Sequence, residues 1–194
     1  LSMDLFASPK FRYGLETKGS WNDYELDRLS DHWRATAGPF TDVSLSPYVN
    51  VRVGAGYSGV FLDRTYLRAG ATGETTYHDY YAYGRWSHRL NKFLQYRLNV
   101  GKEQQTGWSA VNLDLISAGL AVSWALFRDI DFGHYISYGS ASEGGGGFNE
   151  DYDYLQLGLR IGWHFARRWT ATLGYDHVIK DSERDILDYD QNRV

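Results

Sequence analysis

The sequence YDYLQLGLRIGWHFARRWTATLGYDHVI, residues 152–179, carries the clearest structural pattern in this chain. Its first arm alternates an apolar set of residues with a set that is polar or glycine. The apolar set is Leu155, Leu157, Leu159, Ile161, Trp163 and Phe165, and the other set is Gln156, Gly158, Arg160, Gly162 and His164. Because the side chains of a strand alternate with a period of two, this arm predicts a strand with one apolar and one polar face.

The arm is also about twice as long as the usual strand of roughly 5–6 residues. The turn that follows it is short and is flanked by Phe165 and Trp169. Long strands with alternating faces, short turns and aromatic collars are together typical of a transmembrane β-barrel. We therefore predict an all-β protein that folds as an antiparallel up-and-down transmembrane β-barrel.

The composition of the chain agrees with this class. Its 194 residues suffice for one domain, and we expect residues 1–194 to form a single outer-membrane β-barrel domain. Only 3 prolines interrupt the chain, and the absence of cysteine excludes disulfides and thiol chemistry. The net charge of −4 gives no reason to expect a nucleic-acid partner. No apolar run approaches the roughly 18 residues of a transmembrane helix.

The same alternation predicts about ten strands along the chain. They cover residues 10–21, 32–39, 48–62, 75–88, 93–103, 115–127, 130–140, 152–165, 169–180 and, as the start of a truncated last strand, 191–194. The connections are long after the odd-numbered strands and short after the fourth, sixth and eighth. Only the connection after the second strand, with Pro39 and Pro47, is of medium length. Bacterial barrels keep short turns in the periplasm and long loops outside the cell, so the pattern predicts this orientation.

Aromatic residues gather near the predicted short turns. This set is Trp86, Phe93, Trp124, Phe127, Phe132, Trp163, Phe165 and Trp169. A second set, mostly tyrosine, lies near the long loops. Amphipathic rings prefer both interfaces of a membrane, so the two sets predict two aromatic girdles. The alternation alone does not say which face points inward, but strand length, girdles and loop asymmetry favour lipid outside and a polar lumen inside.

Eleven charged residues fall on the polar face and are predicted to line the lumen. They are Arg12, Glu16, Lys18, Arg34, Arg52, Asp79, Arg85, Arg97, Glu103, Arg160 and Asp176. An excess of arginine favours anions. Alternatively, the charges form a structural network that plugs a narrow barrel. For ten strands alone the plug is favoured, because small barrels have filled interiors, whereas further strands would favour a pore.

Catalytic and metal sites are not evident. In His78-Asp79 and Asp176-His177 the neighbouring side chains point to opposite faces of a strand, so neither pair can cooperate directly. We predict no catalytic residues, no cofactor and no metal site. Acidic residues cluster in two segments, and either bind calcium and bridge lipopolysaccharide or form solvated loops. They are Glu150, Asp151, Asp153, Asp181, Glu183, Asp185, Asp188 and Asp190.

Three segments resemble a known family. Residues 80–98 (YYAYGRWSHRLNKFLQYRL), 157–177 (LGLRIGWHFARRWTATLGYDH) and 188–194 (DYDQNRV) are similar to bacterial outer-membrane β-barrel proteins of the type 2 β-barrel porin group. The resemblance implies a Gram-negative outer-membrane location and a pore, and it supplies no catalytic residues. Such barrels end in an aromatic residue, whereas this sequence stops at Val194. We expect roughly eight residues of the final strand to be missing.

Three functions remain open. The first is a porin-like or channel-like barrel that passes small polar or anionic solutes. The second is a plugged structural or anchoring barrel that binds a partner protein or other subunits through residues 22–31, 64–74 and 142–151. The third, which the sequence favours least, is a barrel enzyme. In each case outer-membrane lipid and lipopolysaccharide are the expected surroundings.

Overall fold

The computed structural model describes residues 1–22, 31–62, 76–105, 112–144, 150–166, 169–184 and 187–193. They form eleven strands in one antiparallel sheet whose order follows the chain. The strands are β1 Ser2–Ala7, β2 Phe11–Asn22, β3 His32–Ser46, β4 Val49–Leu62, β5 Thr76–Arg89, β6 Leu94–Gln105, β7 Asn112–Phe127, β8 Ile130–Gly144, β9 Glu150–Ala166, β10 Trp169–Ser182 and β11 Tyr189–Arg193. The predicted all-β, antiparallel up-and-down class is confirmed. No described segment is a helix long and apolar enough to cross a membrane.

One strand was not predicted. β1 is short, lies before Pro9 and pairs antiparallel with β2 from Ser2↔Glu16 to Ala7↔Arg12. Its six residues carry Asp4 in the middle and show little alternation, so the sequence pattern is too weak to reveal it. The sheet therefore contains one strand more than the predicted ten.

The second predicted strand is longer than expected. β3 continues through Pro39 to Ser46, and its bridges to β4 stop at Ala37↔Tyr57 and resume at Phe40↔Gly54. Proline lacks the N–H of a ladder bond, which is why it reads as a strand end in the sequence. The medium-length connection predicted after this strand was wrong. It is a tight turn in which the Ser46 hydroxyl accepts bonds from the backbone N–H groups of Tyr48 and Val49, both at 3.1 Å.

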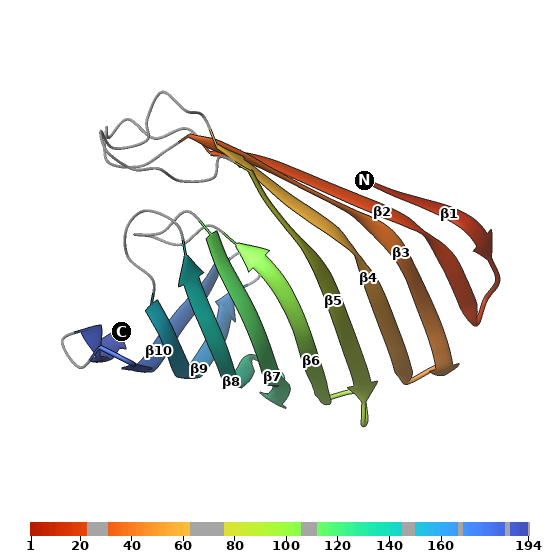
Figure 1. Cartoon of the computed structure of the whole chain (residues 1–194). Coiled ribbons are helices and arrows are strands. Elements are labelled where there is room, and N and C mark those ends of the chain that lie inside the picture. Colours follow the sequence, from red (N-terminus) through yellow and green to blue (C-terminus); the bar gives the residue numbers. More distant parts are fainter. Residues whose placement is uncertain are drawn as a thin grey trace.

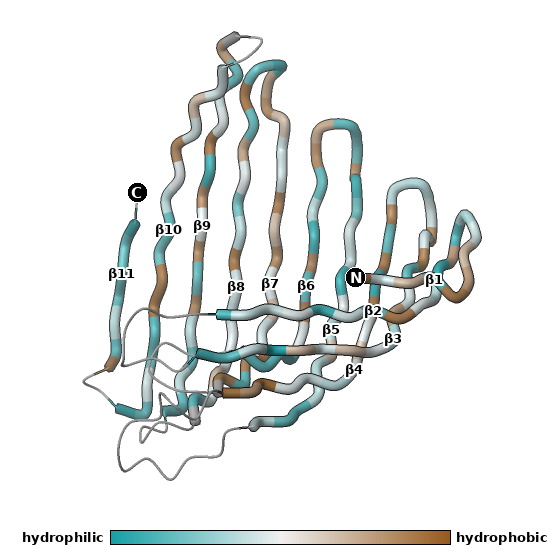
Figure 2. Tube along the Cα trace, turned by 90° about the horizontal axis from the view of Figure 1, so that it is seen from above, coloured by the Kyte–Doolittle hydropathy of each residue, from teal (hydrophilic) through white to brown (hydrophobic). Residues whose placement is uncertain are grey.

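The sheet is curled and its strands bend. Figures 1 and 2 show that the long-loop halves of β2, β3 and β4 run across the direction of β6–β10 instead of alongside them. Near the middle of β3 and β4 the two backbones approach closely, because a Cβ on Gly38 would lie 2.5 Å from the Gly56 Cα. Only glycine allows such an approach. Within the described residues no pairing joins β1 to β11, so closure into a barrel stays a prediction.

The sheet divides between β5 and β6. Pairing runs from Arg89↔Gln95 to Ala82↔Lys102 and then stops, although β5 continues back to Thr76 and β6 on to Gln105. Figure 1 shows the two strands diverging toward the long-loop end. At this fork Lys102 forms an ion pair with Asp79 at 2.6 Å. Its ammonium group also lies 3.9 Å from the centre of the Tyr80 ring.

The two faces of the sheet have opposite environments. The face with the residues predicted for the lumen is concave, because one cavity on it touches residues from β2 to β8. On this concave face Glu16 is 5% exposed and Phe40 is 1% exposed. On the opposite, convex face the apolar residues are open, with Ile116 60% and Leu173 64% exposed. The apolar core within the described residues is small, a cluster of Leu113, Leu115 and Ala141 with two tyrosines packed against it.

Candidate functional site

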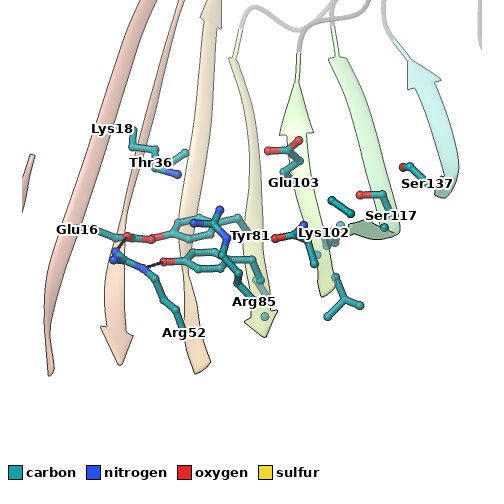
Figure 3. A pocket seen from close by; sticks show the side chains of 18 of the residues that line it. Glu16, Lys18, Thr36, Arg52, Tyr81, Arg85, Lys102, Glu103, Ser117 and Ser137 are labelled. Atoms are coloured by element: carbon teal, nitrogen blue, oxygen red, sulfur yellow. Dashed lines mark hydrogen bonds and ion pairs between the residues drawn. The ribbon is translucent and has the colours of Figure 1, made fainter. Parts of the chain in front are cut away.

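A cavity of about 830 Å³ occupies the concave face. Figure 3 shows side chains from several strands pointing into it. It contains six of the eleven residues predicted for the lumen, namely Glu16, Lys18, Arg34, Arg52, Arg85 and Glu103. Each lies at an alternate position of its strand, so the period of two brings them to one side of the sheet.

Arg52 on β4 is the centre of a charge network at one wall of this cavity. Its Nη2 lies 2.7 Å from Glu16 Oε2, and its Nη1 lies 3.3 Å from Asp42 Oδ2. Its Nε donates to the Tyr83 hydroxyl at 2.9 Å, and its guanidinium lies 4.3 Å from the centre of the Phe40 ring. Arg52 therefore connects β4 to β2, β3 and β5, and these contacts stabilise the curled sheet.

The same network includes two further groups. Arg12 Nη2 lies 2.7 Å from Asp42 Oδ2, which also accepts from Arg52. The Tyr81 hydroxyl donates to Glu16 Oε1 at 3.5 Å. Arg12 Nη1 also lies 3.8 Å from Asp4 Oδ2, so two arginines face three carboxylates and this network adds no positive charge.

Three other cations in the cavity lack such partners. Lys18, Arg34 and Arg85 form no ion pair with any carboxylate of the described residues. Arg85 Nε donates to Asn99 Oδ1 at 3.1 Å, and Arg34 Nε is buried without a hydrogen-bond partner. Glu103, in the same cavity, attracts Arg34 electrostatically. One carboxylate opposite three cations leaves this part of the cavity positively charged.

Five predicted lumen residues lie outside this cavity. Arg12 belongs to the network around Arg52, and Asp79 pairs with Lys102 at the fork. Arg97 is exposed on the concave face, and Arg160 lines a second cavity. Asp176 accepts a hydrogen bond from the Tyr135 hydroxyl at 2.8 Å.

Sequence reasoning missed two charged residues of the site. Asp42 was placed in a connection, because Pro39 concealed the second half of β3. Lys102 follows the alternation of the convex face, yet it lines the cavity because the sheet opens beside it. A strand extension beyond Pro39 could have revealed Asp42, whereas nothing in the local sequence signals the fork.

The predicted aromatic girdle residues gather at the short-turn end of the sheet. All eight lie within a few residues of a short turn, and the cross-strand pair Trp124↔Phe132 belongs to this band. The rings of Trp163 and Phe165 lie 5.1 Å apart. Phe127 is 70% exposed and Trp169 is 68% exposed. Their role at a membrane interface stays a prediction.

Charged residues mark the other border of the convex face. Asp151 and Asp153 precede the apolar stripe of β9, and Asp181 of β10 lies opposite Asp153. Between this acidic border and the aromatic band, the stripe of β9 runs from Leu155 to Phe165. That length matches the roughly 9–11 residues that a tilted transmembrane strand needs.

Metal ligands and comparisons with known proteins supply no further evidence about the site. In the part of the chain that the structure describes, no three His, Asp or Glu side chains gather as metal ligands. The structure does not describe residues 23–30, 64–74 and 145–149 of the segments proposed as partner contacts, nor Asp185. No protein-family model and no curated protein sequence matches the chain. The function is therefore inferred from the geometry of the sheet.

Proposed function

We propose that the chain is an outer-membrane β-barrel channel of a Gram-negative bacterium that passes small polar or anionic solutes along its concave face. The observation that carries the proposal is the kind of side chain that each face of the sheet exposes. Large apolar side chains are open on the convex face, while the polar side chains of Glu16, Thr36 and Ser58 are covered on the concave face. Moving one such apolar side chain out of water contributes about 1.5–3 kcal/mol, so a convex face of this kind is stable against hydrocarbon.

The unpaired cations support a channel for anions. Lys18, Arg34 and Arg85 line a cavity large enough for a small solute. A pore lined by positive charge raises the local concentration of anions and disfavours cations. The resemblance to the type 2 β-barrel porin group agrees with a pore, and the eleventh strand favours a pore over a plug because a wider barrel is less readily filled.

A second candidate is a plugged barrel that anchors a partner protein. The network of Arg12, Asp42, Arg52 and Glu16 favours it, because these side chains occupy the interior beside β2–β5 and hold one another in place. In both candidates we propose lipid and lipopolysaccharide as the surroundings of the convex face.

Reconstitution tests the proposal. The protein is purified in detergent, mixed with liposomes for flotation and added to planar bilayers. We expect it to require detergent, to float with the liposomes and to give conductance steps that favour chloride over potassium. A protein that stays monomeric in buffer without detergent contradicts the membrane assignment. Insertion without conductance contradicts the channel and supports the anchoring barrel.

A further inference from the structure

A second cavity, of about 390 Å³, lies on the concave face at the short-turn end of β5–β10. Three cations from separate parts of the chain line it, namely Arg89 at the end of β5, Lys92 in the following turn and Arg160 on β9. None of the three forms an ion pair with a carboxylate of the described residues. Ser123, Thr170 and Thr172 add hydroxyl groups to the lining.

The one carboxylate that lines this cavity is already engaged. Asp131 Oδ2 lies 2.6 Å from Nε2 of His164, and Nδ1 of the same ring lies 2.9 Å from the Thr170 hydroxyl. These two contacts connect β8, β9 and β10, and they hold the Asp131 carboxylate beside the His164 ring. The three cations outnumber this carboxylate, so the cavity attracts an anion from solution.

Two glycines, Gly133 and Gly162, form part of the lining of this cavity. Along one row of the sheet, Gln95 pairs with Ser123, Ser123 with Gly133, and Gly133 with Arg160. A Cβ on Gly133 would have its nearest heavy atom at 3.7 Å, and one on Gly162 at 3.9 Å. These nearest atoms are Cβ of Arg160 and Cβ of Asp131, at ordinary van der Waals distance, and no aromatic ring is among the nearest contacts of either glycine, so the lining here is low between the cations.

We infer that this cavity binds the phosphoryl group of a small solute. Guanidinium groups donate paired hydrogen bonds to phosphoryl oxygens, an ammonium adds a compact positive charge, and hydroxyls supply further donors. The site rests on the proposed function, because it lies where the channel would hold its solute at the short-turn mouth. It narrows the solute class from anions in general to free phosphate or small phosphorylated compounds.

Calorimetry in a maltoside detergent, with inorganic phosphate as the probe at low ionic strength, tests the site. We expect saturable binding that Arg89→Ala combined with Arg160→Ala weakens at least tenfold. Gly133→Val should also weaken binding, because it adds a side chain to the lining without changing charge. Arg128→Ala removes one positive charge from the turn between β7 and β8, outside the cavity, and should leave binding unchanged.

Three outcomes decide against the site. They are no saturable binding, an equal loss in Arg128→Ala, or equally tight binding of chloride. A short-chain phosphatidylglycerol that binds more tightly than phosphate would transfer the site to a lipid headgroup and overturn the solute assignment. Conductance is recorded on the same preparation. A conducting protein that does not bind phosphate refutes this inference alone, whereas failure to insert or conduct refutes the proposed function.

Discussion

At the scale of single residues, glycines on the concave face make room for aromatic rings. The Tyr135 ring lies over Gly158, and a Cβ on this glycine would overlap the ring. The ring is fixed, because its hydroxyl donates to Asp176 and accepts from Gln156, both at 2.8 Å. We expect Gly158→Ala to lower the free energy of unfolding by about 1–3 kcal/mol, the usual cost of overpacking. Urea unfolding in detergent or lipid measures it.

Gly162→Ala is the matched control on the same strand. Its Cβ would meet nothing closer than 3.9 Å, so we expect it to be nearly neutral. Removing the ring with Tyr135→Ala should abolish the difference between the two glycine variants. Equal stability of the two single variants would show that the ring does not depend on Gly158.

Charged residues at the long-loop border give a second prediction at this scale. Glu150 stands before the apolar stripe of β9, outside the proposed membrane segment, and pairs with Lys180. Burial raises the pKa of the Glu150 carboxyl, but the bonds from Lys180 and Ser182 outweigh it and hold the pKa below its usual value. This pair therefore contributes stability above the unfolded pKa of about 4.3, and loses it as the pH falls through the lower folded value.

Glu150→Gln should accordingly lower the unfolding free energy at pH 7 by about 1–3 kcal/mol, and by much less at pH 2–3. Thermal unfolding of both proteins across this range measures the difference. Glu183→Gln, at an exposed position of the same border, should show no such dependence. A constant difference between Glu150→Gln and the parent protein from pH 7 to pH 2 would contradict the assignment.

At the scale of one strand, neighbouring residues face different surroundings. Ile136 of β8 pairs with Leu120 and Leu157, belongs by alternation to the convex face and is 38% exposed, whereas Ser137 alternates to the concave face. If hydrocarbon covers the convex face, Ile136→Arg should cost about 2–4 kcal/mol and reduce insertion into membranes. Ser137→Arg should insert normally, because the cavity accommodates a charge. Flotation with liposomes measures both, and equal insertion of the two variants would contradict lipid on the convex face.

At the scale of the whole molecule, the arginines of the concave face have two roles. Arg52 connects neighbouring strands through ion pairs, whereas Arg85 forms no ion pair within the described residues. Arg52→Ala leaves Glu16 covered and unpaired, and we expect a loss of about 3–5 kcal/mol in stability. Arg85→Ala breaks no ion pair, and we expect normal stability with a lower preference for chloride over potassium. Unfolding and bilayer recordings on both variants separate the roles. Unchanged selectivity in Arg85→Ala would place Arg85 outside the path of the ions.

The sequence by itself determined the strand class, most strand positions and the division of side chains between two faces, since alternation and turn residues are local signals. Residues 155–165 show this, because all of them lie within β9 as predicted. Only the tertiary structure decided which face is concave, which residues surround Arg52, and where β5 and β6 part. Those features depend on register and curvature across strands distant in the chain, which a period of two does not encode. Lys102 lies on the convex side by alternation but lines the cavity, because its neighbouring strand turns away.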